Sequence, residues 1–116
     1  AISLDSGEFR WRSVLGVVDK LIAKGLPPTG TSNLGSSIVT AGGLVFIGAT
    51  NDARFRAFDK QTGKELWVTR LSASAHAAPM TYLGAKSKRQ FVVIAVGGGN
   101  KYNATYSDEL VAFSLP

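Results

Sequence analysis

The stretch Ala57-Phe-Asp-Lys-Gln-Thr-Gly-Lys-Glu-Leu-Trp67 decides the fold, because the chain carries it more than once. Residues 1–11 (AISLDSGEFRW) align with it without a gap, at an offset of 56 residues, and keep its Ala, Gly and Trp. A third, partial copy, Ala112-Phe-Ser-Leu-Pro116, begins 55 residues after the second. Self-similarity at this spacing is typical of a protein built from repeated structural units.

The spacing within this motif has a physical basis. Asp59 can accept hydrogen bonds from backbone amides about two residues further on and so begin a turn. Gly63 can adopt a positive φ, which closes a connection between two strands at little steric cost. Trp67 then lies on the outgoing strand, with a large apolar face for the neighbouring unit and an indole N–H for a carbonyl group. The motif therefore predicts a strand–turn–strand corner that packs against the adjacent repeat.

Short β-type segments separated by Gly, Asn, Asp and Ser fill most of the chain. One hairpin is predicted within residues 37–47 and another within residues 79–96, with further strands at 54–58, 65–69 and 109–114. A unit of this size cannot bury its own sheet, and radial stacking of four-stranded sheets solves that problem. We therefore expect an all-β fold, with about two antiparallel four-stranded blades of a larger β-propeller.

The strand pattern also gives the expected organisation along the chain. It divides the sequence into outer strands of a preceding blade (1–14), a long connection with a short helix (15–35), a complete blade (36–70) and a partial last blade (71–116). The chain starts within a strand-like segment, so we expect it to be a fragment. The open strand edges of such a fragment would pair with the remaining blades of the parent chain, or between copies to give a dimer.

Composition narrows the function classes. The chain has 116 residues, no cysteine and a formal net charge of +5. Its basic residues are scattered, whereas a nucleic-acid surface concentrates them in a stripe, so we expect no nucleic-acid partner. The densest basic cluster, Lys86–Arg89, falls in a predicted hairpin turn. Alternation in Arg54-Phe-Arg-Ala57 predicts that its two arginines share a solvated strand face.

Several motifs resemble one family. Ala57-x-Asp-x-x-x-Gly-Lys-x-x-Trp67 resembles the tryptophan-docking motif of quinoprotein dehydrogenase propellers. The stretches Thr31-x-Asn-x-Gly35, Phe91–Gly99 and Leu110–Pro116 resemble the C-terminal blades of the glucose and quinate dehydrogenase branch. The resemblance implies an eight-bladed, periplasmic or periplasm-facing enzyme, membrane-anchored through an N-terminal region. Such an enzyme oxidises a sugar, polyol or other alcohol with pyrroloquinoline quinone (PQQ) and Ca²⁺ or Mg²⁺, and passes the electrons to ubiquinone or a cytochrome.

The resemblance also implies roles for individual residues. The family's catalytic base and metal ligands belong to earlier blades, so no catalytic or metal-binding residue is expected here. The residues expected to contact the cofactor are Asn33, Asp52, Gly98 and Gly99. Two alternatives stay open: Asp52 as a turn residue that bonds its own backbone, and Asn33 as a residue that stabilises its loop. His76, the only histidine, has no partner in a triad pattern and is expected to be structural or at the rim of the site.

Two competing functions come from other classes. Propellers with the same docking motif also serve as cofactor-free scaffolds, such as the outer-membrane-assembly lipoproteins, and the repeat alone does not separate the two. A small autonomous β-domain that binds a sugar or nucleic acid would have to explain the strand-like start of the chain. The Thr31–Gly35 and Gly97–Gly99 stretches favour the dehydrogenase.

Overall fold

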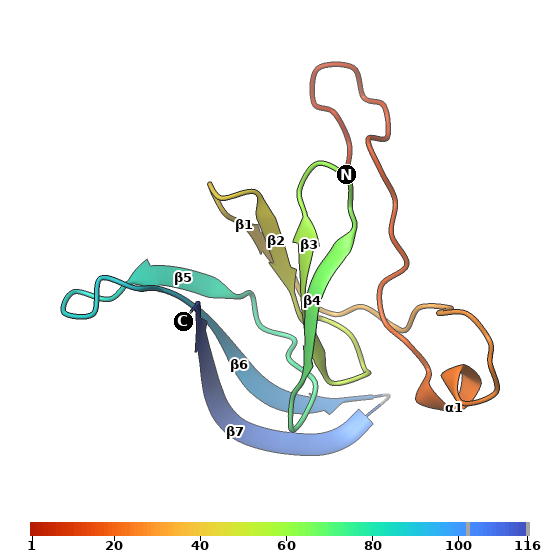
Figure 1. The fold of residues 1–116 in the computed structure, drawn as a ribbon. Coiled ribbons are helices and arrows are strands. Elements are labelled where there is room, and N and C mark those ends of the chain that lie inside the picture. The colour runs from red at the N-terminus through yellow and green to blue at the C-terminus, as the bar shows by residue number, and fades with distance from the viewer. Residues whose placement is uncertain (102, 116) are drawn as a thin grey trace.

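The chain forms two antiparallel sheets in the computed structural model, which describes residues 1–101 and 103–115 (Figure 1). The first sheet has four strands in the order β1-β2-β3-β4 and the second has three in the order β5-β6-β7. A short helix, α1, precedes both. The bounds are α1 Asp19–Ile22, β1 Ser37–Val39, β2 Leu44–Ile47, β3 Arg54–Asp59, β4 Glu65–Arg70, β5 Met80–Leu83, β6 Gln90–Asn100 and β7 Asn103–Ser114. This arrangement confirms the prediction of successive propeller blades.

Both sheets are meanders, so their connections alternate between two ends. Antiparallel neighbours reverse direction, which brings the segments before β1, between β2 and β3, between β4 and β5, and at the end of β6 to one end. We call this end the loop face; it comprises residues 31–36, 48–53, 71–79 and 97–101. The tight turns lie at the other end, the turn face, which comprises residues 40–43, 60–64 and 84–89.

The two sheets pack against each other through a small aromatic and aliphatic core. Phe55 of β3 and Ile94 of β6 are fully buried and belong to one cluster. The Phe55 ring lies 5.7 Å from that of Phe113 on β7, and the Trp67 ring lies 5.2 Å from the same Phe113. These contacts join elements of both sheets, so neither sheet buries its apolar face alone.

The corner predicted from the repeat is present in the structure. Asp59 Oδ1 accepts hydrogen bonds from the backbone amides of Gln61 (2.9 Å) and Thr62 (2.7 Å). Gly63 has φ +71°, and the indole nitrogen of Trp11 donates to the carbonyl oxygen of Lys60 at 2.9 Å. A Cβ on Gly63 would overlap the Trp11 ring, so the indole docks directly on this turn.

Trp67 occupies the equivalent corner one repeat further on. Its ring makes an edge contact with Phe113, which belongs to the third, partial copy of the motif. Each tryptophan therefore packs against the next copy along the chain. This is the relation expected between neighbouring blades of a propeller.

Three features differ from the sequence prediction or extend it. The solvated face predicted for Arg54 and Arg56 is wrong: Arg56 is 2% exposed and β3 is covered on both sides, because acidic side chains from other segments neutralise the arginines. β6 and β7 are longer than predicted and stay paired up to Asn100 and Asn103, with register shifts around Gly98. In residues 1–14 the structure shows a turn closed by a single bridge between Ile2 and Phe9.

Candidate functional site

The loop face brings four separate segments of the chain together. Asn33 forms an isolated bridge with Thr50, and the Leu34 amide donates to the Ala49 carbonyl at 2.8 Å. The Ala49 amide in turn donates to the Ala75 carbonyl at 2.6 Å. The long connection, the β2–β3 connection and the β4–β5 connection are thus joined by backbone hydrogen bonds, which gives this face a fixed shape.

Glycines allow β6 and β7 to approach closely at the same face. Gly98 and Gly99 both have φ +61°, which a side chain would disfavour. A Cβ on Gly98 would overlap the Thr105 carbonyl oxygen, and one on Gly99 would overlap the Tyr106 ring. The Gly98 amide also donates to the Ser74 carbonyl at 2.8 Å and so links the end of β6 to the β4–β5 connection. Packing within the sheet therefore accounts for both glycines, whether or not a ligand lies on the other side.

A cluster of planar polar side chains connects the two blades. His76 Nδ1 lies 2.9 Å from the Leu34 carbonyl oxygen, and His76 Nε2 lies 2.7 Å from the amide nitrogen of Asn100. The same nitrogen of Asn100 donates to Asn51 Oδ1 at 2.8 Å. We call Asn51, His76 and Asn100 the amide–imidazole cluster. It links one side chain from each of three connections of the loop face.

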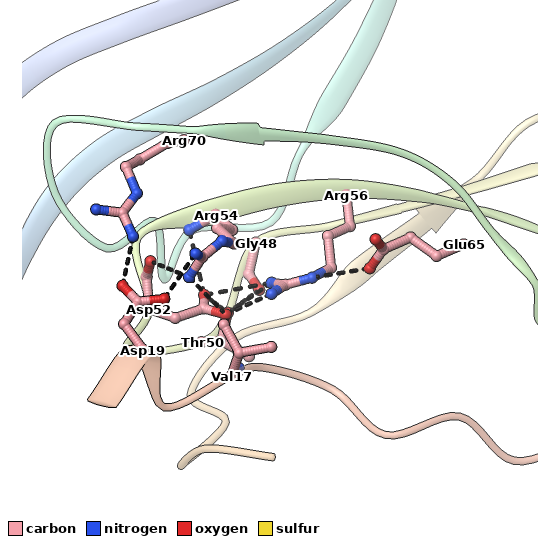
Figure 2. Close-up of polar contacts among 9 residues, drawn as sticks. All are labelled: Val17, Asp19, Gly48, Thr50, Asp52, Arg54, Arg56, Glu65 and Arg70. Carbon is pink, nitrogen blue, oxygen red and sulfur yellow. Dashed lines mark hydrogen bonds and ion pairs between the residues drawn. The ribbon is translucent and has the colours of Figure 1, made fainter. Parts of the chain in front are cut away.

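Asp52 lies at the centre of a network of charges beneath this face (Figure 2). Its side chain is 1% exposed and forms an ion pair with Arg56, whose side chain is 3% exposed. Thr50 Oγ1 donates to Asp52 Oδ1 at 2.6 Å, and the Val17 amide donates to Asp52 Oδ2 at 2.9 Å. Arg56 Nε reaches Glu65 of β4 at 3.1 Å. The network therefore ties the long connection to the first sheet.

The electrostatics of Asp52 follow from these contacts. Burial raises the pKa of its carboxyl group, but hydrogen bonds from Arg56 and Thr50 and the charge of Arg56 outweigh this effect, so the pKa is lowered overall. Asp52 is therefore a carboxylate that keeps the buried Arg56 neutralised. It also accepts a hydrogen bond from the Arg54 amide at 3.2 Å, as a turn aspartate does.

A second acidic residue fixes the start of the long connection. Asp19 of α1 accepts from Arg54 Nη2 at 2.7 Å and also pairs with Arg70. Hydrogen bonds from both arginines lower the pKa of Asp19. Figure 2 shows Arg54 between the Asp19 and Asp52 carboxylates, so α1 is held against the end of β3 and β4.

The four residues predicted to contact a cofactor all lie at the loop face or directly beneath it. Asn33 is exposed there, while Asp52 directs its carboxylate to protein groups and Gly98 and Gly99 pack on β7. Their contact with a cofactor stays a prediction. Sequence reasoning missed Asn51 and Asn100, since a lone asparagine beside a turn gives no signal of its own.

The described residues contain neither a cluster of metal-ligating side chains nor a helix that could cross a membrane. No group of three His, Asp or Glu side chains among them could hold a metal ion. In residues 1–101 and 103–115 no helix has the length and apolarity needed to cross a bilayer. The loop face offers hydrogen-bonding groups, which include side-chain amides, an imidazole and backbone groups.

Comparison with known proteins identifies the family. Residues 1–92 match the family model described as "PQQ: Glucose/ethanol/alcohol dehydrogenase, beta-propeller domain". The whole chain is 40% identical to a probable quinate dehydrogenase (quinone) of Xanthomonas campestris pv. juglandis. It is also 39% identical, over 99% of its length, to quinoprotein glucose dehydrogenase A of Acinetobacter calcoaceticus. The chain spans 15% of the length of each of these relatives.

Solved structures agree with this result. The quinohemoprotein alcohol dehydrogenase from Comamonas testosteroni superimposes on 72% of this chain with a TM-score of 0.60 and 34% identity, and the match covers 13% of that protein. A europium-containing methanol dehydrogenase matches 58% of the chain with a TM-score of 0.54 and 42% identity, over 11% of its own length. The chain belongs to the β-propeller domain family of the PQQ-dependent glucose, ethanol and alcohol dehydrogenases.

Proposed function

We propose that this chain forms one sector of the propeller of a PQQ-dependent dehydrogenase that oxidises a sugar, a polyol or another alcohol. The observation that carries the proposal is the match of residues 1–92 to that dehydrogenase family. Relatives that match nearly the whole chain bear names of the same kind, among them a quinate/shikimate dehydrogenase (quinone) and a glycerol dehydrogenase large subunit. A cofactor-free scaffold would share the blades, but it would not account for these matches.

The loop face is the surface that we assign to the cofactor. PQQ is a planar quinone with carboxylate groups, and amide N–H donors are suitable partners for such oxygens. Asn33 is exposed on this face and Asn51 lies in the adjoining connection. The residues present therefore fit the group. When bound, the quinone supplies the oxidising chemistry that amino-acid side chains lack, and this chain contributes orientation and hydrogen bonds.

Asp52 supports the site from beneath in this proposal. It keeps Arg56 neutralised and accepts from the Val17 amide, so it holds the long connection that carries Asn33. The catalytic base and the ligands for Ca²⁺ or Mg²⁺ belong to other parts of the protein. Among the described residues, no three His, Asp or Glu side chains cluster as metal ligands.

The remaining partners are also proposals. A relative of Thauera butanivorans is named 1-butanol dehydrogenase (cytochrome c), and others are named for a quinone, which supports ubiquinone or a cytochrome as the electron acceptor. We propose a periplasmic or periplasm-facing location, as the resemblance to the glucose and quinate dehydrogenases implies.

The free edge of β7 suggests where further blades contact this sector. Among the described residues β7 pairs only with β6. At the end of β7 an apolar groove of about 770 Å³ lies between the two sheets, and its lining includes Trp67, Phe113 and Leu115. We assign this edge and groove to the remaining blades of the parent chain. Residues 1–116 prepared alone would then dimerise through the same edge, which size-exclusion chromatography with light scattering measures.

Reconstitution of the whole protein tests the proposed function. The apoprotein is mixed with PQQ and either Ca²⁺ or Mg²⁺, and the oxidation of glucose, quinate, glycerol and short alcohols is followed with an artificial electron acceptor. We expect PQQ binding and activity on at least one substrate only when the quinone is present. A whole protein that folds but binds no PQQ would contradict the proposal and favour the scaffold.

A further inference from the structure

Hydrogen-bond polarity in the amide–imidazole cluster is fixed by one backbone carbonyl. The carbonyl oxygen of Leu34 can only accept a hydrogen bond, so the proton of the neutral His76 ring lies on Nδ1. His76 Nε2 is then an acceptor. It faces Asn100, which must present its amide nitrogen and not its oxygen.

The polarity continues from Asn100 to Asn51. The amide nitrogen of Asn100 donates a hydrogen bond to Asn51 Oδ1 at 2.8 Å as well as to His76 at 2.7 Å. This orients the Asn51 amide, because its oxygen must face Asn100. Asn51 Nδ2 therefore lies on the other side of the amide, and it makes no hydrogen bond to any residue that the structure describes.

The position of Asn51 makes its side-chain amide accessible to a ligand at the loop face. Asn51 is half-buried in the β2–β3 connection, on the loop face and one residue before the buried Asp52. Asn100 of β6 holds the Asn51 side-chain oxygen, so less side-chain entropy is lost when the remaining N–H groups bind an acceptor. A positioned N–H donor without an acceptor in the protein can bind an oxygen atom of a ligand.

We propose that the amide–imidazole cluster is a binding site for a carboxylate or carbonyl oxygen, in which Asn51 Nδ2 is the donor and His76 and Asn100 position it. The inference rests on the proposed function for the identity of the ligand. Two molecules carry such an oxygen there: PQQ itself and an acidic substrate. The ligand chemistry is the same in both cases, and the experiment separates the two sources.

The substitution Asn51→Asp is the sharpest perturbation. Aspartate keeps an oxygen that can accept from Asn100, so the inner bond of the cluster survives. The outward donor becomes an oxygen that repels a carboxylate. Gln61→Glu makes the same chemical change on an exposed residue of the turn face and serves as the matched control. His76→Gln is the second variant, because it can still accept from Asn100 but no longer binds the Leu34 carbonyl in the same way.

The experiment uses the whole enzyme and two ligands. PQQ affinity is measured by fluorescence quenching of the apoenzyme, and KM and kcat are measured on the holoenzyme with quinate, which carries a carboxylate, and with a neutral sugar. We expect Asn51→Asp to weaken PQQ or to raise the KM for quinate by about tenfold, with the neutral sugar affected less. His76→Gln should give a smaller change of the same kind, and Gln61→Glu should match wild type.

The outcomes are distinguishable. A weaker PQQ complex assigns the donor to the cofactor, and an unchanged PQQ complex with a raised KM for quinate assigns it to the substrate. Unchanged values for both ligands in Asn51→Asp, in a protein that melts like wild type, would overturn the inference while leaving the proposed function intact. A wild-type protein that binds no PQQ would instead contradict the proposed function.

Discussion

Replacing Gly63 by alanine tests how the blades are joined. Gly63 has φ +71°, and an added Cβ would overlap the docked Trp11 ring. Two costs are therefore expected. The left-handed backbone conformation costs about 1–2 kcal/mol for a residue with a Cβ. Displacing the indole breaks its hydrogen bond to the Lys60 carbonyl, which costs about 0.5–1.5 kcal/mol, and loses part of the ring packing as well.

Gly7 provides a matched control within the same chain. It holds the equivalent position of the first repeat, with φ +73°, and a Cβ there would meet nothing within 4 Å. The turn hydrogen bonds are also equivalent. The Gly7 amide donates to the Ser3 carbonyl oxygen at 2.8 Å, and the Gly63 amide donates to the Asp59 carbonyl oxygen at 2.9 Å. Gly7→Ala should therefore show the backbone cost alone.

Hydrogen exchange of the two turns measures the difference in residues 1–116 prepared alone, where an added Cβ on Gly7 would meet nothing within 4 Å. Gly7→Ala should raise the exchange of its own turn by about 5- to 30-fold. Gly63→Ala should raise the exchange of residues 59–64 by at least about twofold more, because docking is lost as well. Equal effects of the two substitutions would refute the claim that Trp11 docks on Gly63.

Two further predictions concern the loop face. The pKa of Asp52 is lowered in the folded protein, so its carboxylate stabilises the fold. This stabilisation is complete above the ordinary aspartate pKa of about 3.9 and is lost as the pH falls through the pKa in the folded protein. Asp52→Asn removes one of the two carboxylates that pair with Arg56 and leaves Glu65 in place, so urea unfolding at pH 7 should show a loss of about 1–3 kcal/mol in the free energy of unfolding. The acid dependence should shrink, and an unchanged acid profile would contradict the ion pair. Gly98→Ala should lower the melting temperature of the apoprotein, because a Cβ would overlap Thr105, whereas Gly97→Ala should leave it unchanged; equal melting temperatures would show that the packing is misplaced.

Local spacing was sufficient to predict the blade corners. The turn at Asp59 and the positive φ of Gly63 depend on positions within one short motif, and the indole hydrogen bond of Trp11 joins two copies of it. The repeat of that motif then placed one blade beside the next. This much of the fold follows from sequence, because each feature needs only its near neighbours and a second copy.

The environment of the arginines could not be predicted in the same way. Alternation places Arg54 and Arg56 on one face of β3, but it does not say what covers that face. Asp19 arrives from α1 and Glu65 from β4, and together with Asp52 they neutralise both arginines. A strand pattern reports the period of its own side chains and carries no information about ionic partners from other segments.

The amide–imidazole cluster shows the same limit at the site. Asn51 and Asn100 are 49 residues apart, and His76 and Asn100 are 24 apart. None of the three forms a motif with its sequence neighbours. Only the pairing of the blades brings them together, so His76 could be assigned no more than a structural or rim role from sequence.

A structure of the whole protein with PQQ bound tests the central claim most directly. The loop face should form one wall of the quinone site, with residues 31–35, 48–53 or 97–100 in contact with the cofactor and Trp11 docked on Gly63. A quinone bound against the turn face, or one remote from every residue of this chain, would contradict the account.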